Sequence, residues 1–281
     1  MADDTPSGHP FSRTLQTIKA LIPSPGSPLS SRTLPGIHKE ALPFLPALLR
    51  EAGRKELFWI LTSTPERALR LFEEISTSSA LLDQTLDGVL FPEEEILPYD
   101  RESPADFIRA ERIHALDRLS NSGNLDFVVA PVTAIMRKTL PPGLLRSRKR
   151  SILTGMEVDP QSIIESLLSY GYIRVPQVTA PGEFSVRGAL LDLYSTDRRK
   201  PVRIEWDDLQ IRSIRLFDPA SQRSVGPVSS VDLLPSHEWL VPDSGTKESP
   251  ERLSWLRTHA LVPYPPGIER YVPSFFPEAD S

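Results

Sequence analysis

The chain has 281 residues, 39% of them hydrophobic and 25% charged, which suits a globular protein with a core. Its formal charge of −5 gives no general attraction to nucleic acid, and the absence of cysteine excludes disulfides, thiolate catalysis and cysteine-ligated zinc. The N-terminus lacks the pattern of a signal peptide, and the most apolar stretch, residues 41–49, is short and contains two prolines. We therefore expect a cytoplasmic protein without a membrane span.

Residues 1–35 are rich in Ser, Thr, Pro and Gly, which predicts a flexible N-terminal arm. Residues 57–61 (LFWIL) form a continuous apolar run, as expected of a strand that is buried on both faces. Thr64 suits a helix N-cap and Pro65 the first helical position. Apolar residues then repeat at helical spacing: Ala68, Leu69, Phe72 and Ile75. This pattern predicts one β-α unit.

The rest of a first domain, residues 36–150, continues the alternation. Ser103-Pro104 predicts the start of a second helix, residues 127–130 (FVVA) a buried strand, and Pro131 the start of a further helix. Strands that alternate with helices favour a parallel sheet with helices on both faces. The basic run at residues 146–150 (RSRKR) is interpreted as a solvated linker at the end of this domain.

Residues 151–240 have the pattern of a small α+β domain with an antiparallel sheet. Residues 161–169 predict a helix, and residues 184–194, 202–206 and 211–217 predict three strands that pair as hairpins. In the second strand Val202, Ile204 and Trp206 face one way, and Arg203 and Glu205 face the other. In the first strand the alternation of inward-facing and outward-facing residues is interrupted at Gly188, which predicts a bulge or a close backbone approach. Residues 241–281 are expected to be a linker and the start of a segment that returns to the first domain.

Several kinds of catalytic motif are absent from the sequence. It contains no Gly-Lys dipeptide, so there is no P-loop, and its five histidines are never three or four residues apart, so no helical zinc pair exists. There is also no Gly-x-Ser-x-Gly motif. We therefore assign no catalytic, cofactor-binding or metal-binding residues, and no cofactor.

Three further groups of residues receive structural interpretations. The acidic run Glu93-Glu94-Glu95 is interpreted as a solvated turn rather than a metal site. Arg112, on the apolar stripe of its helix, is expected to form a structural ion pair. His237 is expected to serve packing or capping rather than catalysis.

The second domain resembles the UvrA-docking domain shared by transcription-repair coupling factors and the excinuclease protein UvrB. The resemblance rests on five ordered matches: residues 182–194 (GEFSVRGALLDLY), 202–206 (VRIEW), 211–218 (IRSIRLFD), 221–224 (SQRS) and 233–238 (LLPSHE). Outside this domain, similarity to the coupling factor extends to residues 97–100, 103–104 with Arg112, 129–132 and 267–276. Where UvrB has a P-loop, this chain reads LPGIHKE at residues 34–40.

The resemblance implies a degenerate P-loop-type α/β domain, followed by a docking domain that binds UvrA and recruits nucleotide excision repair. It places the family's two docking arginines on Arg187 and Arg203, which we expect on neighbouring strands. Where the family has a second aromatic residue after Trp206, this chain has Asp207, so docking is expected to be weaker or altered. In the family, RNA polymerase binding and the ATP-driven translocase lie further along the chain than this segment.

Alternative interpretations remain open. The chain is either an adaptor or the N-terminal part of an ATP-dependent DNA translocase whose motor lies elsewhere. A third interpretation is a DNA-binding module that uses Arg146, Arg148, Lys149 and Arg150 with Arg137 and Lys138, which makes DNA in a repair complex a further partner. The residues from 174 to 217 have a formal charge of +2, which fits an acidic partner. In the alternative structural interpretation, Asp192 or Glu205 satisfies the two arginines within the sheet.

Overall fold

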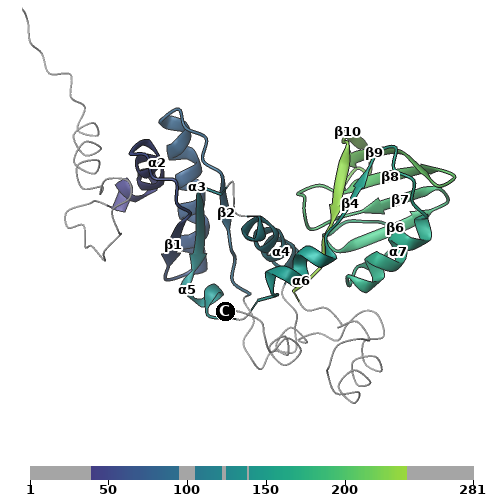
Figure 1. Cartoon of the computed structure of the whole chain (residues 1–281), viewed down its shortest axis with the longest axis horizontal. Coiled ribbons are helices and arrows are strands. Elements are labelled where there is room, and N and C mark those ends of the chain that lie inside the picture. The colour runs from purple at the N-terminus through teal and green to yellow at the C-terminus, as the bar shows by residue number, and fades with distance from the viewer. Residues whose placement is uncertain (1–38, 95–104, 122–124, 138, 239–281) are drawn as a thin grey trace, which may run out of the picture. The chain divides into compact units, whose positions relative to one another are not determined.

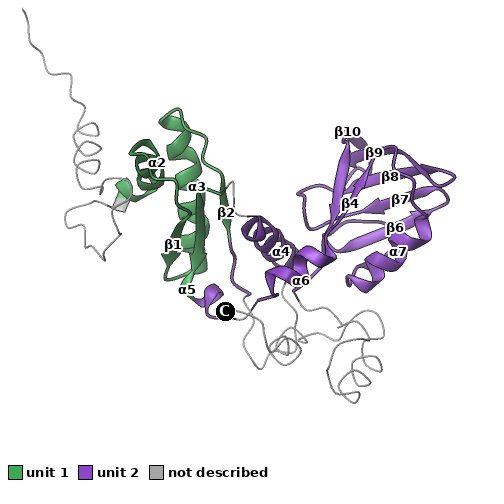
Figure 2. Cartoon of the chain, in the orientation of Figure 1, with its two compact units in different colours: residues 1–90, 122–132 green, residues 91–121, 133–281 purple. Residues whose placement is uncertain are grey.

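A computed structural model describes residues 39–94, 105–121, 125–137 and 139–238. The chain divides into two compact units, residues 1–90 with 122–132 and residues 91–121 with 133–281 (Figures 1 and 2). Among the described residues, no helix is both long enough and apolar enough to cross a bilayer.

The first unit contains a three-stranded parallel sheet in the order β1-β3-β2. Its elements are η1 (Lys39–Phe44), α2 (Leu45–Glu51), β1 (Phe58–Thr62), α3 (Pro65–Leu81), β2 (Gly88–Leu90) and β3 (Phe127–Pro131). The short helix α5 (Val132–Ile135) follows β3 directly. The parallel sheet that the sequence predicts is therefore confirmed.

Helix α3 begins as its sequence predicts. Thr64 is the N-cap residue, and its hydroxyl accepts a hydrogen bond from the amide of Arg67 at 3.3 Å. Ala68 and Ile75 are fully buried and pack with Phe127 of β3 in one apolar cluster. Leu69, by contrast, is half exposed, so the buried stripe is narrower than the spacing suggested.

Strand β1 differs from its prediction, because it is buried on one side only. Trp59 and Leu61 are about half exposed, whereas Phe58 and Ile60 pack against the α3 cluster. The reason is position: β1 lies at the edge of the sheet, and the central strand β3 is the one buried along its whole length. A run of apolar residues did not distinguish an edge strand from a central strand.

The second unit contains a six-stranded sheet in the order β10-β9-β8-β7-β6-β5 and a two-stranded sheet of β11 and β4 (Figure 1). Its helices are α4 (Asp106–Ser120), α6 (Pro142–Arg148) and α7 (Pro160–Ser169). Its strands are β4 (Arg150–Leu153), β5 (Ile173–Arg174), β6 (Glu183–Arg187), β7 (Leu190–Leu193), β8 (Val202–Asp207), β9 (Gln210–Phe217), β10 (Ser224–Pro227) and β11 (Ser230–Leu233). All pairs are antiparallel except β5 with β6, which confirms a mixed α/β fold with a mostly antiparallel second region.

One face of the six-stranded sheet packs into the core, and we call it the inner face. Val202, Ile204 and Trp206 of β8 are buried there, as the alternation predicts. Helix α7 adds Ile163 and Leu167 to the same cluster, and β4 and β11 add residues from the other sheet. The opposite face, which carries Arg203 and Glu205, is the outer face.

The predicted strand at residues 184–194 is in fact a hairpin. Arg187 of β6 pairs with Leu190 of β7, so Gly188 and Ala189 form a two-residue turn. Gly188 has φ +59°, a left-handed conformation that suits such turns, and no atom lies within 4 Å of where its Cβ would be. The slip in alternation therefore marks a chain reversal rather than a bulge or a close approach.

The predicted linker at residues 146–150 is also wrong, because these residues complete α6 and begin β4. Leu145, just before the run, is buried with Ile113 and Leu140, which explains why this basic segment is helical. Ser103-Pro104, together with residues 34–38, 97–100, 138 and 267–276, lies outside the described residues. Helix α4 begins at Asp106, with Ala105 as its N-cap residue.

Helix α7 ends in a Schellman motif that depends on Gly171. The amide of Tyr172 donates to the carbonyl of Leu167 at 3.0 Å, and the amide of Gly171 donates to the carbonyl of Leu168 at 3.1 Å. Gly171 has φ +82°, and a Cβ there would lie 2.2 Å from Nε2 of the buried His237. His237 thus packs directly against the end of α7, as expected of a packing residue.

We predict that Gly171→Ala destabilises the second unit more than Gly155→Ala does. Both glycines have a positive φ, so each substitution incurs about 1–2 kcal/mol of backbone strain. Only Gly171 has a close neighbour, and overpacking there adds roughly 1–3 kcal/mol. Urea unfolding followed by circular dichroism measures both variants, and equal losses would contradict the packing of His237 on Gly171.

Candidate protein-binding surface

The two arginines singled out in the sequence lie on the outer face of the six-stranded sheet, but not on neighbouring strands. Arg187 is on β6 and Arg203 on β8, and β7 lies between them. The expectation of adjacent strands failed because residues 184–194 form two strands rather than one. On β7, Asp192 pairs directly across from Arg203 and is diagonal to Arg187.

Asp192 binds both arginines. Arg203 donates from Nε to Oδ1 at 2.6 Å and from Nη2 to Oδ2 at 2.9 Å, and Arg187 donates from Nη2 to Oδ2 at 2.6 Å. The Asp192 side chain is only 2% exposed, so its carboxylate requires these charged partners. We call Arg187, Asp192 and Arg203 the arginine clasp.

Arg203 is the more tightly held arginine of the clasp. Its hydrogen bonds to Asp192 raise its pKa above the ordinary value, so it stays charged. Its guanidinium also lies over the ring of Phe217, 5.0 Å from the centroid, and its side chain is 24% exposed. The side chain of Arg187 is 55% exposed, so it presents more of its surface to a partner.

Pairing with Asp192 leaves both arginines able to bind a partner. A guanidinium carries five N–H donors. Arg203 directs two toward Asp192 and Arg187 directs one, so each keeps at least three for other acceptors. The sequence left two alternatives: the arginines pair with Asp192 inside the sheet, or they dock to a partner. This geometry makes the two compatible.

Glu205, the other acceptor considered, belongs to a different group. It accepts a hydrogen bond from the hydroxyl of Ser213 on β9 at 3.1 Å. Arg212 and Arg215 lie near it, each with a guanidinium nitrogen 3.9 Å from a carboxylate oxygen. The sequence reasoning missed these two arginines, because Arg212 lies where the register of β8 and β9 shifts and simple alternation fails.

Asp207 is exposed at the far end of β8, where it pairs with Gln210. The turn that follows contains Asp208, with φ +55°, and the half-exposed Leu209. Asp207 is four residues beyond Arg203, roughly 13 Å along an extended strand. It therefore lies apart from the clasp.

Arg112 forms the buried ion pair that was expected of it. Its side chain is 1% exposed and contacts Glu238 through Nε, while Nη1 donates to the carbonyl of Pro92 at 2.7 Å. Nε also lies 3.5 Å from Glu94, which is itself mostly buried. Glu94 is thus part of an ion-pair cluster, so the prediction of a solvated acidic turn is wrong for this residue.

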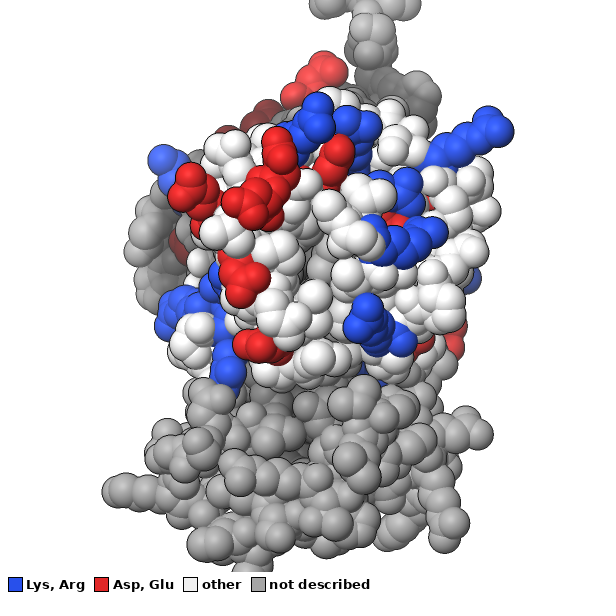
Figure 3. All heavy atoms as spheres, turned by 90° about the vertical axis from the view of Figure 1, so that its right-hand side faces the viewer, with Lys and Arg blue, Asp and Glu red and all other residues white. Residues whose placement is uncertain are grey.

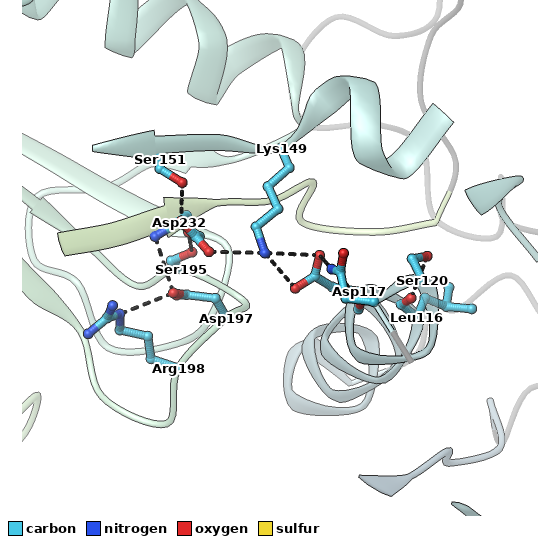
Figure 4. A network of polar contacts seen from close by, with 10 residues as sticks. Leu116, Asp117, Ser120, Lys149, Ser151, Ser195, Asp197, Arg198 and Asp232 are labelled. Atoms are coloured by element: carbon cyan, nitrogen blue, oxygen red, sulfur yellow. Dashed lines mark hydrogen bonds and ion pairs between the residues drawn. The ribbon is translucent and has the colours of Figure 1, made fainter. Parts of the chain in front are cut away.

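The basic run at residues 146–150 is largely engaged inside the second unit. Lys149 lies 2.8 Å from Asp117 of α4 and 3.0 Å from Asp232 of β11. Figure 4 shows its side chain between these two carboxylates. Burial lowers the pKa of Lys149, but its hydrogen bonds to both carboxylates raise it overall. Arg150 donates to the hydroxyls of Ser162 and Ser166 on α7. Arg137 pairs with Glu94 at 3.3 Å, so at least three cations of the proposed DNA-binding module have structural partners.

The surface of the second unit carries both signs of charge. Figure 3 views it from the side that lies at the right in Figure 1, and there basic and acidic side chains occur together rather than as a field of one sign. Among the described residues, no group of three or more His, Cys, Asp or Glu is placed to hold a metal ion. The outer face with its clasp is therefore our candidate protein-binding surface.

Comparison with known proteins identifies the family of the segment that contains this sheet. Residues 151–239 match a family model described as the UvrB interaction domain. Transcription-repair-coupling factors from Bacillus subtilis (strain 168) and Escherichia coli (strain K12) are 30% and 31% identical over 231 and 226 residues, or 82% and 76% of this chain. The corresponding protein from Myxococcus xanthus is 41% identical over 152 residues, or 54% of the chain.

These matches cover 19%, 19% and 13% of the relatives, so the chain spans less than a fifth of their length. Within that segment the match to the UvrB interaction domain includes β4 from Ser151 onward and every later described element. The chain carries a UvrB interaction domain and is homologous to transcription-repair-coupling factors.

Proposed function

We propose that this chain binds UvrA through the outer face of its six-stranded sheet and so recruits nucleotide excision repair in the bacterial cytoplasm. The observation that carries the proposal is the arginine clasp. Two arginines are held by one buried carboxylate on the outer face of the sheet, opposite the main core cluster and beside a smaller buried cluster of Val178, Tyr194 and Phe217. The match to the UvrB interaction domain and the names of the relatives support a role in repair.

The clasp suits an acidic partner surface. A guanidinium binds a carboxylate through two parallel, charge-assisted hydrogen bonds, which gives both energy and orientation. Because Asp192 and Phe217 already fix Arg203, little side-chain freedom is lost when a partner binds. This pre-organisation favours docking by the folded sheet without rearrangement.

The role we infer for this segment is that of an adaptor. Binding to RNA polymerase and ATP-driven translocation along DNA would belong to other parts of the longer family proteins. A DNA-binding role through residues 146–150 is less well supported, because Lys149 and Arg150 are engaged with Asp117, Asp232 and α7.

A calorimetric titration of the chain with UvrA tests the proposal. We predict a dissociation constant of about 10 μM or tighter, which corresponds to roughly −7 kcal/mol. Arg187→Ala should weaken binding by about tenfold or more, because it removes an exposed charge-assisted contact. The thermal midpoint should change little, since Arg203 still pairs with Asp192. Absence of binding by the unaltered chain would refute the proposal.

A second prediction separates the structural role of Arg203 from its role in docking. Arg203→Ala removes the bidentate partner of a buried carboxylate, so it should destabilise the fold by roughly 3 kcal/mol. Adding Asp192→Asn removes that buried charge and should restore much of the lost stability. Affinity for UvrA should stay low in the double variant. If binding returned together with stability, Arg203 would be a structural residue only.

Asp207 provides the third prediction. Asp207→Phe should tighten binding to UvrA about tenfold, which is about 1.4 kcal/mol, because an exposed aromatic can bury apolar area at the interface. Asp207→Ala is the matched control, since it removes the charge without adding a ring. Equal gains in the two variants would assign the effect to charge, and unchanged or weaker binding by Asp207→Phe would contradict the prediction.

A further inference from the structure

A second pair of arginines lies on the same outer face, beside the clasp. Arg212 and Arg215 are on β9 and approach Glu205 at 3.9 Å each. Arg215 pairs directly across from Arg203, in the transverse row that also contains Asp192 and Ser185. The outer face thus has two carboxylates, each approached by two arginines, and the six side chains are spread over β6, β7, β8 and β9.

The two pairs differ in how firmly they are held. Clasp contacts measure 2.6–2.9 Å around a carboxylate that is 2% exposed. Glu205 is 33% exposed, and Arg212 and Arg215 are 68% and 53% exposed. At 3.9 Å and in contact with water, such pairs contribute little to the stability of the fold. The second pair is therefore not explained by a structural role.

The arrangement also has an electrostatic cost. Arg203 and Arg215 are like charges in directly opposite positions, and such cross-strand pairs destabilise a sheet. Four arginines share two carboxylates, Asp192 and Glu205, so this group of six side chains has an excess of two positive charges. Asp207, at the end of β8, offsets one of them. The positive charge is local to this group, because Glu183 of β6 also lies on the outer side by alternation and the whole chain is negative.

We propose that Arg212 and Arg215 extend the docking surface onto β9 and steer an acidic partner toward the clasp. This inference rests on the proposed function and assigns different kinetic roles to the two pairs of arginines. Exposed charges at the rim of an interface act mainly on the rate of association, whereas fixed, desolvated contacts act on dissociation. Arg212 and Arg215 set the association rate, whereas Arg187 and Arg203, which hydrogen bonds to the buried Asp192 hold in place, set the lifetime of the complex.

The test is a kinetic measurement with immobilised UvrA and the full chain in solution, at several salt concentrations. We expect Arg212→Ala/Arg215→Ala to lower the association rate constant about three- to tenfold at about 50 mM salt. The dissociation rate constant should change less than about twofold. The difference should vanish near 1 M salt, where the screening length is about 3 Å.

Three control variants make the result specific. Arg212→Lys/Arg215→Lys keeps both charges and should keep the association rate. Arg67→Ala/Arg70→Ala removes two exposed arginines from α3 in the other unit, so it matches the change in net charge and should have no comparable effect. Arg187→Ala should instead raise the dissociation rate. Thermal midpoints of all variants show that each is folded.

The outcomes separate this inference from the proposed function. If Arg187→Ala weakens binding and Arg212→Ala/Arg215→Ala leaves the association rate at low salt unchanged, the steering inference is wrong and docking through the clasp stands. An equal loss in Arg67→Ala/Arg70→Ala would assign the effect to net charge and also overturn it. If the unaltered chain does not bind UvrA, both the inference and the proposed function are wrong.

Discussion

A carboxylate that is almost fully removed from water has to be matched by positive charge, and Asp192 imposes this constraint on the outer face of the sheet. Its position in the middle of β7 lets arginines from both neighbouring strands, β6 and β8, reach it. Two arginines are consequently fixed on either side of β7, each with at least three N–H donors that Asp192 does not use. The positions of the two proposed docking arginines therefore follow from their pairing with the buried Asp192 carboxylate.

Much of the architecture could be predicted from the sequence, because local chemistry and periodicity agreed. The cap at Thr64, the parallel β1 and β3, the helix α7 and the alternation of β8 are all found. The cap follows from the chemistry of a single residue, and in the other cases one pattern of burial repeats over several residues. The outward direction of Arg203 followed from the same alternation.

Other features depended on contacts that a linear pattern does not contain. Gly188 breaks the alternation in the same way whether the chain bulges or reverses, so only pairing between β6 and β7 resolves it. Arg212 was missed because the register shift beside Trp206 moves it onto the outer side next to Glu205. The basic run at residues 146–150 was interpreted as solvated, since its acidic partners Asp117 and Asp232 are distant in sequence.

Lys149 lies just outside the matched family segment, yet it takes part in the contacts that hold the docking module together. The matched family segment starts at residue 151, yet β4 begins at Arg150 and pairs with β11 at the opposite end of that segment. Lys149 immediately precedes it and joins β11 to α4. A truncation at residue 151 would therefore remove the first residue of β4 and leave Asp117 and Asp232 without Lys149, the cation they share.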